Sequence, residues 1–196
     1  MERKIILIGA VMLVLGIGIG YALVGTPTSR QAGGHMMPDG SAMGQNIDQH
    51  FIVQMIPHHE GAIAMAKIAL TRSKRPEILS LANGIIEAQE KENKDMRAWY
   101  ASWFGSAPPS GHSGMMHMDG MSGNTDTLSS VSDAQFDREF IEQMIPHHEM
   151  AIMMAQMLQA STQRSEMKVL ANNIITSQTR EIEMMRSWLK SWYGTE

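Results

Sequence analysis

Apolar side chains recur at helical spacing in four separate stretches of this chain. In the first stretch the recurring positions are Phe51, Met55, Ala62, Ala66 and Ala69. After a polar break at 71–75, a second stripe consists of Leu81, Ile85, Gln89, Glu92, Met96, Trp99 and Trp103. No stretch shows the apolar-polar alternation expected of a strand. The pattern therefore predicts an all-α protein.

The second half of the chain repeats the first. The motif Gln-Met-Ile-Pro-His-His-Glu at 54–60 recurs at 143–149, and the same offset of 89 residues relates 47–105 to 136–194 without a gap. The corresponding positions of the second copy are Phe140, Met144, Ala151, Ala155, Leu170, Ile174, Gln178, Glu181, Met185, Trp188 and Trp192. One helical hairpin cannot bury its apolar face alone, so two hairpins are predicted to form a four-helix bundle with approximate two-fold symmetry.

Each copy has a proline inside its first stretch, Pro57 or Pro146, directly before a pair of histidines. A proline within a helix bends it and frees a backbone carbonyl, whereas a proline can also begin a helix. Because apolar periodicity continues across both prolines, we favour a kinked helix.

The N-terminus reads as a targeting segment. Arg3 and Lys4 precede an apolar run at 5–24, which is typical of an export signal or a membrane anchor. We expect 1–25 to be this signal or anchor, with an uncleaved anchor slightly favoured, and the remainder to lie in the periplasm or elsewhere outside the cytoplasm. The expected order is then a Met/His-rich segment at 26–46, a hairpin at 47–105, a Met/His-rich linker at 106–132 and a hairpin at 133–196.

Composition narrows the candidate chemistry. The chain has 20 methionines, no cysteine and a net charge of −4. The charge offers no strong basic field for nucleic acid. Without thiolates, a soft metal site must use thioether sulfur, with imidazole as the other donor. Copper, with Cu(I) favoured, is the expected ion, and silver can substitute for it.

Methionines cluster with histidines in the two Gly- and Ser-rich segments. These candidate ligands are His35, Met36, Met37, Met43, His112, Met115, Met116, His117, Met118 and Met121. A solvated segment has no core for methionine to fill, so a flexible grip on Cu(I) or Ag(I) is expected. The alternatives are an apolar tail that contacts a membrane or partner, and low complexity without function.

The repeated histidines border the predicted core. Relative to Met55 on a helical wheel, His58 lies about 60° to one side and His59 about 40° to the other. Met65 lies on the His58 side, two turns further on. The second copy offers Met144, His147, His148 and Met154, with Met150, Met153 and Met157 nearby. Metal ligation competes here with a purely structural role, since methionine also fills cores.

Polar residues on the second stripe of each copy need partners. Glu92 and Glu181 could orient a histidine ligand, or could belong with Gln89 and Gln178 to a hydrogen-bond network of the bundle. Glu60 and Glu149, next to the histidines, could act in the same way.

Several enzyme classes lack their motifs in this chain. There is no Glu-x-x-His spacing around the histidines for a di-iron bundle and no His-Glu-x-x-His for a zinc protease. A blue-copper site needs a cysteine, and neither a phosphate-binding loop nor a nucleophile elbow is present.

The motif Met-Ile-Pro-His-His-Glu, followed by Gln-x-x-Glu and Met-x-x-Trp, resembles a family of small exported helical proteins labelled as a domain of unknown function. Its duplicated form with Met/His-rich loops is similar to periplasmic copper-binding proteins of copper resistance. The resemblance covers 47–194 and implies a ferritin-like four-helix bundle that binds Cu(I) and Ag(I). The implied ligands are Met55, His58, His59, Met65, Met144, His147, His148 and Met154. The second copy departs by having Met150 and Met153 in place of Gly61 and Ala64.

The leading hypothesis is a binding protein, not an enzyme, that sequesters copper outside the cytoplasm or delivers it to an efflux system. A sensor protein is a further candidate partner, and N-terminal membrane association is expected. Two alternatives stay open, namely a metal-dependent cuprous oxidase and a Met-rich interaction module with incidental metal binding.

Overall fold

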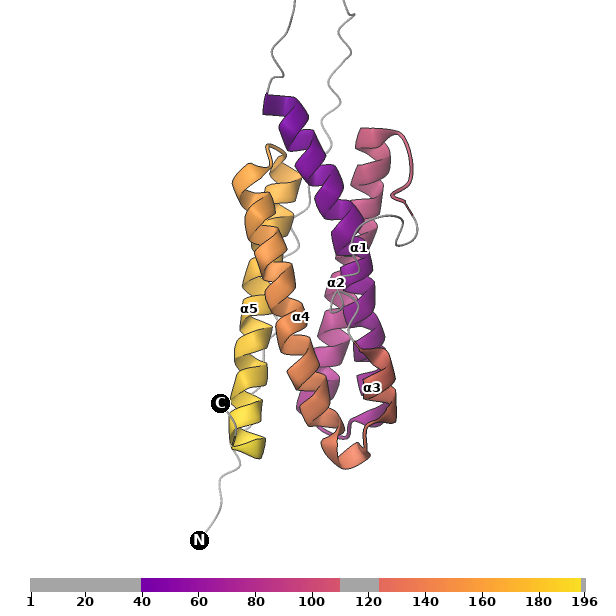
Figure 1. Ribbon diagram of the computed structural model, residues 1–196, viewed down its shortest axis with the longest axis vertical. Helices are drawn as coiled ribbons and strands as arrows, with labels where there is room; N and C mark the ends of the chain where they lie inside the picture. Colours follow the sequence, from indigo (N-terminus) through magenta and orange to yellow (C-terminus); the bar gives the residue numbers. More distant parts are fainter. Residues whose placement is uncertain (1–39, 110–123, 195–196) are drawn as a thin grey trace, which may run out of the picture. The chain divides into compact units, whose positions relative to one another are not determined.

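A computed structural model describes residues 40–109 and 124–194, with side chains described from residue 47 onward (Figure 1). These residues form α1 (Gly40–Arg72), α2 (Pro76–Phe104), α3 (Thr125–Ser130), α4 (Asp133–Ser161) and α5 (Ser165–Tyr193). The part of the chain that is described contains no strand. The predicted all-α class is therefore confirmed.

The four long helices form two hairpins. Helix α1 packs on α2, α4 packs on α5, and the hairpins meet through α1 and α4 (Figure 1). The breaks between paired helices share an extended arginine in both copies, but a proline follows it only in the first copy. Arg75 and Arg164 are extended, and Pro76 then begins α2. Both hairpins end on a left-handed glycine, Gly105 at φ 70° and Gly194 at φ 69°.

Both motif prolines lie inside long helices. Pro57 is within α1 and Pro146 within α4, so the prediction that each helix continues through its proline is confirmed. Most apolar positions of the predicted stripes are also buried, including Phe51, Phe140 and Ile174, whereas the four tryptophans are half-buried. Helical periodicity thus identified the faces that form the core.

The core has two parts. Core A contains Leu128 and residues from the later half of α1, the start of α2, the start of α4 and the end of α5; its methionines are Met65, Met144 and Met185. Core B contains the earlier part of α1 with the end of α2, the end of α4 and the start of α5; its methionines are Met55, Met96 and Met167, with Met154 packed against it. Each core therefore draws on both hairpins.

Reciprocal contacts join the hairpins at their loops. Arg75 Nε lies 3.2 Å from Asp137 Oδ2, and its guanidinium lies 4.1 Å from the centroid of the Trp192 ring. Arg164 repeats this arrangement 3.3 Å from Asp48 and 4.0 Å from Trp103. Because each arginine belongs to one hairpin and its partners to the other, the two copies are related like subunits of a symmetric dimer.

The structure differs from the expected layout at two places. Helix α1 begins at Gly40, within the segment expected to be a flexible connection, and α3 forms within the expected linker. The expected signal or anchor at 1–25 lies outside the described residues. Among the helices that are described, none is long and apolar enough to cross a membrane.

Candidate metal centre

Four buried histidines lie where α1 and α4 meet. Along each helix they stand between the residues of core A and those of core B. The exposed fractions of His58, His59, His147 and His148 are 1%, 0%, 2% and 0%. The expectation that the histidines border the core is therefore confirmed, and their burial is deeper than a border position requires.

The two hairpins contribute one histidine each to a close ring pair. The ring centroids of His58 and His147 lie 3.8 Å apart, and the ring planes are inclined by 43°. Both ring nitrogens of His58 are buried without a hydrogen-bond partner. Burial, followed by the neighbouring His147, His59 and His148, lowers the pKa of His58 far below its ordinary value of 6.5. His58 is therefore neutral at physiological pH, which is the form that binds metals.

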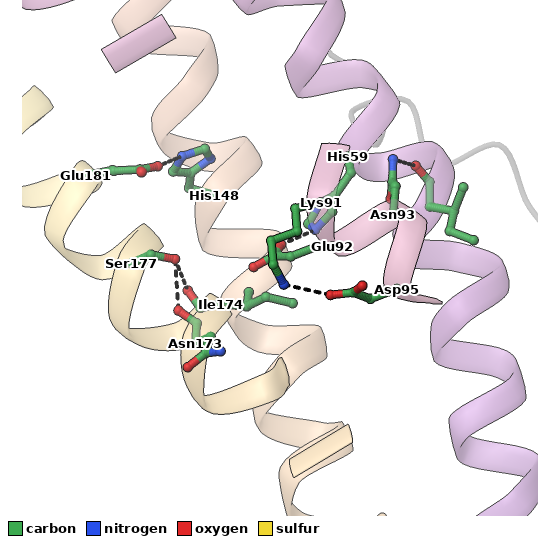
Figure 2. A network of polar contacts seen from close by, with 11 residues as sticks. His59, Lys91, Glu92, Asn93, Asp95, His148, Asn173, Ile174, Ser177 and Glu181 are labelled. Carbon is green, nitrogen blue, oxygen red and sulfur yellow. Dashed lines mark hydrogen bonds and ion pairs between the residues drawn. The ribbon is translucent and has the colours of Figure 1, made fainter. Parts of the chain in front are cut away.

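The other two histidines each contact a glutamate of the paired helix (Figure 2). His59 Nε2 lies 2.7 Å from Glu92 Oε2, and His148 Nε2 lies 2.6 Å from Glu181 Oε2. A carboxylate accepts a hydrogen bond, so in the neutral imidazole Nε2 carries the proton and Nδ1 keeps its lone pair. The Nδ1 atoms of both histidines are buried without a hydrogen-bond partner. Histidines that bind metals typically donate one ring N–H to a carboxylate, which orients the ring so that the other nitrogen can bind the ion.

The other polar groups near the motif have separate roles. Glu60 pairs with Arg97 and Glu149 with Arg186, each at 2.6 Å on the exposed side of a hairpin. Gln89 and Gln178 are buried, and the Oε1 atom of each has no hydrogen-bond partner. The glutamates of α2 and α5, rather than those of the motif, thus face the histidines.

The structure groups the four predicted methionine ligands of α1 and α4 across the repeats. Met55 shares core B with Met154 of the other hairpin, and Met144 shares core A with Met65. The sequence had associated Met65 with Met55 of its own copy. The grouping in the structure arises because α1 and α4 meet at the histidines. One half of each helix therefore packs in core A and the other half in core B.

Three further buried methionines were not among the predicted ligands, and one of them, Met167 of core B, has no methionine counterpart in the first copy. Met96 lies in core B and Met185 in core A, and both are fully buried. Met96 and Met185 could have been identified from the sequence, because they follow Glu92 and Glu181 by four residues. This spacing places each methionine one helical turn from the carboxylate that contacts a histidine. Of the added methionines of the second copy, Met150 is half-buried and Met153 is exposed.

The donor set favours a soft ion. Within 40–109 and 124–194 there is no group of three or more His, Cys, Asp or Glu residues that could hold a metal ion. The metal-binding atoms that the histidines and the two cores offer are imidazole nitrogen and thioether sulfur, a set suited to soft ions. The buried nitrogens without hydrogen-bond partners fit such an ion, because it would satisfy lone pairs that otherwise lack any contact.

The predicted ligands of the two Met/His-rich segments lie outside the described side chains. They are His35, Met36, Met37, Met43, His112, Met115, Met116, His117, Met118 and Met121. Their proposed grip on metal stays a prediction.

Comparisons with known proteins identify the family. The family described as Domain of unknown function (DUF305) matches residues 48–195. A curated relative, the uncharacterized protein L153 of Acanthamoeba polyphaga mimivirus, is 43% identical over 51 residues. The match covers 26% of this chain and 34% of the viral protein, so it spans about a third of that relative's length.

Solved structures with this fold include CopM in metal-bound forms. CopM in the Cu(II)-bound form is 47% identical, with a TM-score of 0.69, over 74% of this chain and 97% of that one. CopM in the Cu(I)-bound form is 45% identical, with a TM-score of 0.67, over 75% and 98%. A DUF305 fragment from Deinococcus radiodurans is 28% identical, with a TM-score of 0.63, over 74% and 96%.

Proposed function

This chain belongs to the family described as Domain of unknown function (DUF305), and from that premise we propose that it binds copper outside the cytoplasm. Its physiological ion is Cu(I), with Ag(I) as a substitute. The single observation that carries the proposal is the buried histidine set between two methionine-containing cores.

The physical argument rests on groups that lack partners. Leaving a buried polar atom without a hydrogen bond destabilises a protein by about 1–3 kcal/mol. His58, His59 and His148 all carry such nitrogens. A metal ion would satisfy these lone pairs, and the neutral state of His58 means that binding there displaces no proton. The likeness to CopM in copper- and silver-bound forms supports the same ion class.

The setting supports a binding protein rather than an enzyme. A basic start and an apolar run favour export with retention at the inner membrane. Thioethers suit an oxidising compartment because they bind metal without forming disulfides. We therefore propose that the protein sequesters excess copper and delivers it to an efflux system or a sensor protein.

An anaerobic titration tests the proposal. The full chain competes for Cu(I) with a chromogenic chelator, and the titration is repeated with Zn²⁺. We expect tight uptake of Cu(I) that zinc does not displace, because zinc prefers harder donors than thioether sulfur. Failure to take Cu(I) from the chelator would refute the proposed function.

A matched pair of variants locates the site. His59→Leu removes an imidazole that is fully buried and contacts Glu92, whereas His50→Leu removes an exposed one from the same helix. We expect weaker Cu(I) binding only in His59→Leu. Equal affinities of the two variants would place the bound copper elsewhere in the chain.

A further inference from the structure

Three methionines of each core correspond between the copies, and core B holds Met167 in addition. Met55, Met96 and Met154 of core B correspond, at the offset of 89 residues, to Met144, Met185 and Met65 of core A. In core A all three are fully buried. In core B Met55 and Met96 are fully buried, but Met154 is only half-buried. The same set of thioethers is thus sealed in one core and partly open in the other.

Exposed methionines lie beside the open set. Met153 and Met157 of α4 are 47% and 59% exposed, and their counterparts in the first copy are Ala64 and Ile68. Water-exposed thioethers are unfavourable by about 25 cal/mol per Å² of apolar surface. The second copy therefore carries a soft, apolar surface feature that the repeat pattern does not require.

Helix α3 accounts for the sealing of core A. It contacts both α1 and α4, and its Leu128 is fully buried in core A together with Met65. Ser132 precedes α4 in an extended conformation that separates it from α3. The counterpart of Ser132 is Met43, which lies within the unbroken helix α1. The chain therefore breaks between α3 and α4 in the second copy, whereas α1 runs unbroken through the corresponding position.

Arg72 of α1 connects α1 to α3 and to the residues that follow α3 through several hydrogen bonds. Its guanidinium donates hydrogen bonds to the carbonyl oxygens of Leu128 at 2.9 Å, Ser129 at 3.1 Å and Val131 at 2.6 Å. It also pairs with Asp133 at 2.7 Å. The counterpart of Arg72 in the second copy is Ser161, which has no guanidinium to make such a set of bonds.

The exposed methionines form a graded path into core B. Met153 and Met157 are one helical turn apart, so their sulfur atoms can reach one ion. Met154 adjoins Met153 in sequence and lies one turn from Met157. It packs against the core that holds Met55 and Met96. Exposure thus falls from the surface pair through Met154 to the buried methionines.

Resting on the proposed function, we infer that Met153 and Met157 form the uptake site through which a soft monovalent ion reaches core B. The ion passes from this surface pair to Met154 and then to the buried thioethers. Core A, closed by α3 and Arg72, takes up the ion more slowly. The two copies therefore differ in the rate of metal uptake although their buried donors correspond.

Stopped-flow mixing of the full chain with Ag(I), followed by tryptophan fluorescence, tests this route. Trp99 and Trp103 pack against core B, and Trp188 and Trp192 against core A, so both cores carry a reporter. The variant Met153→Leu/Met157→Leu keeps the apolar surface and removes the two sulfur atoms. We expect the fast phase to slow severalfold in this variant. Arg72→Gln should instead accelerate the slow phase.

Met184→Leu is the matched control, because Met184 is also an exposed methionine, 37% exposed, but lies on α5. Its uptake should match that of the wild type. If the double variant took up Ag(I) as fast as Met184→Leu, the inferred route would be wrong.

Methyl NMR of protein labelled at the methionine methyl carbon separates this result from a failure of the proposed function. With saturating Ag(I), the methyl signals of Met55, Met96 and Met154 should shift in the wild type and in Met184→Leu. Absence of these shifts in the wild type would refute metal binding in the core, and the route with it. Shifts that are present while the kinetics of the double variant are unchanged would refute the route alone.

Discussion

At the scale of single residues, His58 combines deep burial with two nitrogens that have no hydrogen-bond partner. Replacing it by leucine keeps an apolar side chain of similar size in the same space. We expect His58→Leu to stabilise the metal-free protein by about 1–3 kcal/mol, because the unsatisfied nitrogens are removed. Urea denaturation in the presence of a chelator measures this change.

The control for this prediction is His50→Leu, which alters an exposed histidine of the same helix. Its free energy of unfolding should change little, since surface substitutions usually stay within about 0.5 kcal/mol. The prediction would be contradicted if metal-free His58→Leu were less stable than the wild type. The packing of His58 would then stabilise the protein by more than its unsatisfied nitrogens destabilise it. Copper affinity should fall in His58→Leu and not in the control.

Glu92 offers a second residue-scale prediction. It accepts a hydrogen bond from His59, so Glu92→Gln keeps the shape but removes the negative charge that fixes the imidazole tautomer. We expect Cu(I) affinity to fall by about tenfold or more. Competition with a chromogenic chelator measures it. Glu90→Gln, an exposed residue of the same helix that pairs with Lys67, should bind as the wild type does.

At the scale of the elements, the sequence predicted the helices and their buried faces but not which faces meet. Phe51 and Met55 could be placed on a core stripe because helical geometry fixes which residues share a face. The pairing of His58 with His147 could not be placed, because two hairpins of equal pattern can pack in several registers. The contact of His59 with Glu92 could be predicted only as one of two alternatives, since His59 bordered one stripe and Glu92 lay on the stripe of the paired helix.

Local differences between the copies were harder to predict. The formation of α3 depends on Ser132 starting a new helix, whereas Met43 continues α1. The Ser132 side chain bonds to Gln135 Oε1 and caps no backbone N–H of α4, so the break rests on the extended backbone at this one position. Apolar periodicity is judged over long stretches of sequence and is not sensitive to a single residue at a helix end. The sealing of core A by Leu128 therefore could not be read from the repeat.

The loop arginines give a prediction about hairpin association. Arg164 and Arg75 occupy equivalent positions, but the aspartate that Arg164 contacts, Asp48, is 1% exposed, and Asp137 is 16% exposed. Burial raises the pKa of Asp48, and Thr162 and Arg164 oppose that rise. Arg164→Ala should therefore destabilise the protein by about 3 kcal/mol, because it leaves a buried carboxylate uncompensated. Arg75→Ala should have a smaller effect.

Thermal and urea unfolding of both arginine variants measure this difference. Both variants lose a similar contact with a tryptophan ring, so that loss cancels in the comparison. Equal destabilisation would mean that burial of the aspartate does not decide the strength of these contacts. The additional variant Asp48→Asn/Arg164→Ala should recover part of the loss, because it removes the uncompensated charge.

At the scale of the whole molecule, the two copies share both cores, but α3 packs on core A alone among the described residues. Each core takes one half of every long helix, so neither hairpin has a complete core of its own. The histidines lie between these cores, where both hairpins contribute. Metal bound at the histidines would therefore stabilise the association of the hairpins together with the fold.

The central histidines also make the stability of the metal-free protein depend on pH. The pKa of His58 is lowered in the folded state, chiefly by burial, from its ordinary value of 6.5. Below that ordinary value the unfolded chain binds a proton that the folded protein does not bind. The unfolded state then holds more protons, so the free energy of unfolding falls as pH falls. The contribution of neutral His58 to the free energy of unfolding is fully present above pH 6.5 and is lost progressively as pH falls below that value.

Urea denaturation at pH 7.5 and pH 5.5, with a chelator present, measures this dependence. We expect His58 to account for a loss of about 1.4 kcal/mol between these values, which follows from one proton with its ordinary pKa in the unfolded chain. His58→Leu is the comparison, because it removes this proton and leaves the other histidines in place. The decline should be smaller in the variant by that amount. Equal declines would mean that folded His58 takes up a proton despite its burial, and would contradict a neutral imidazole available to metal.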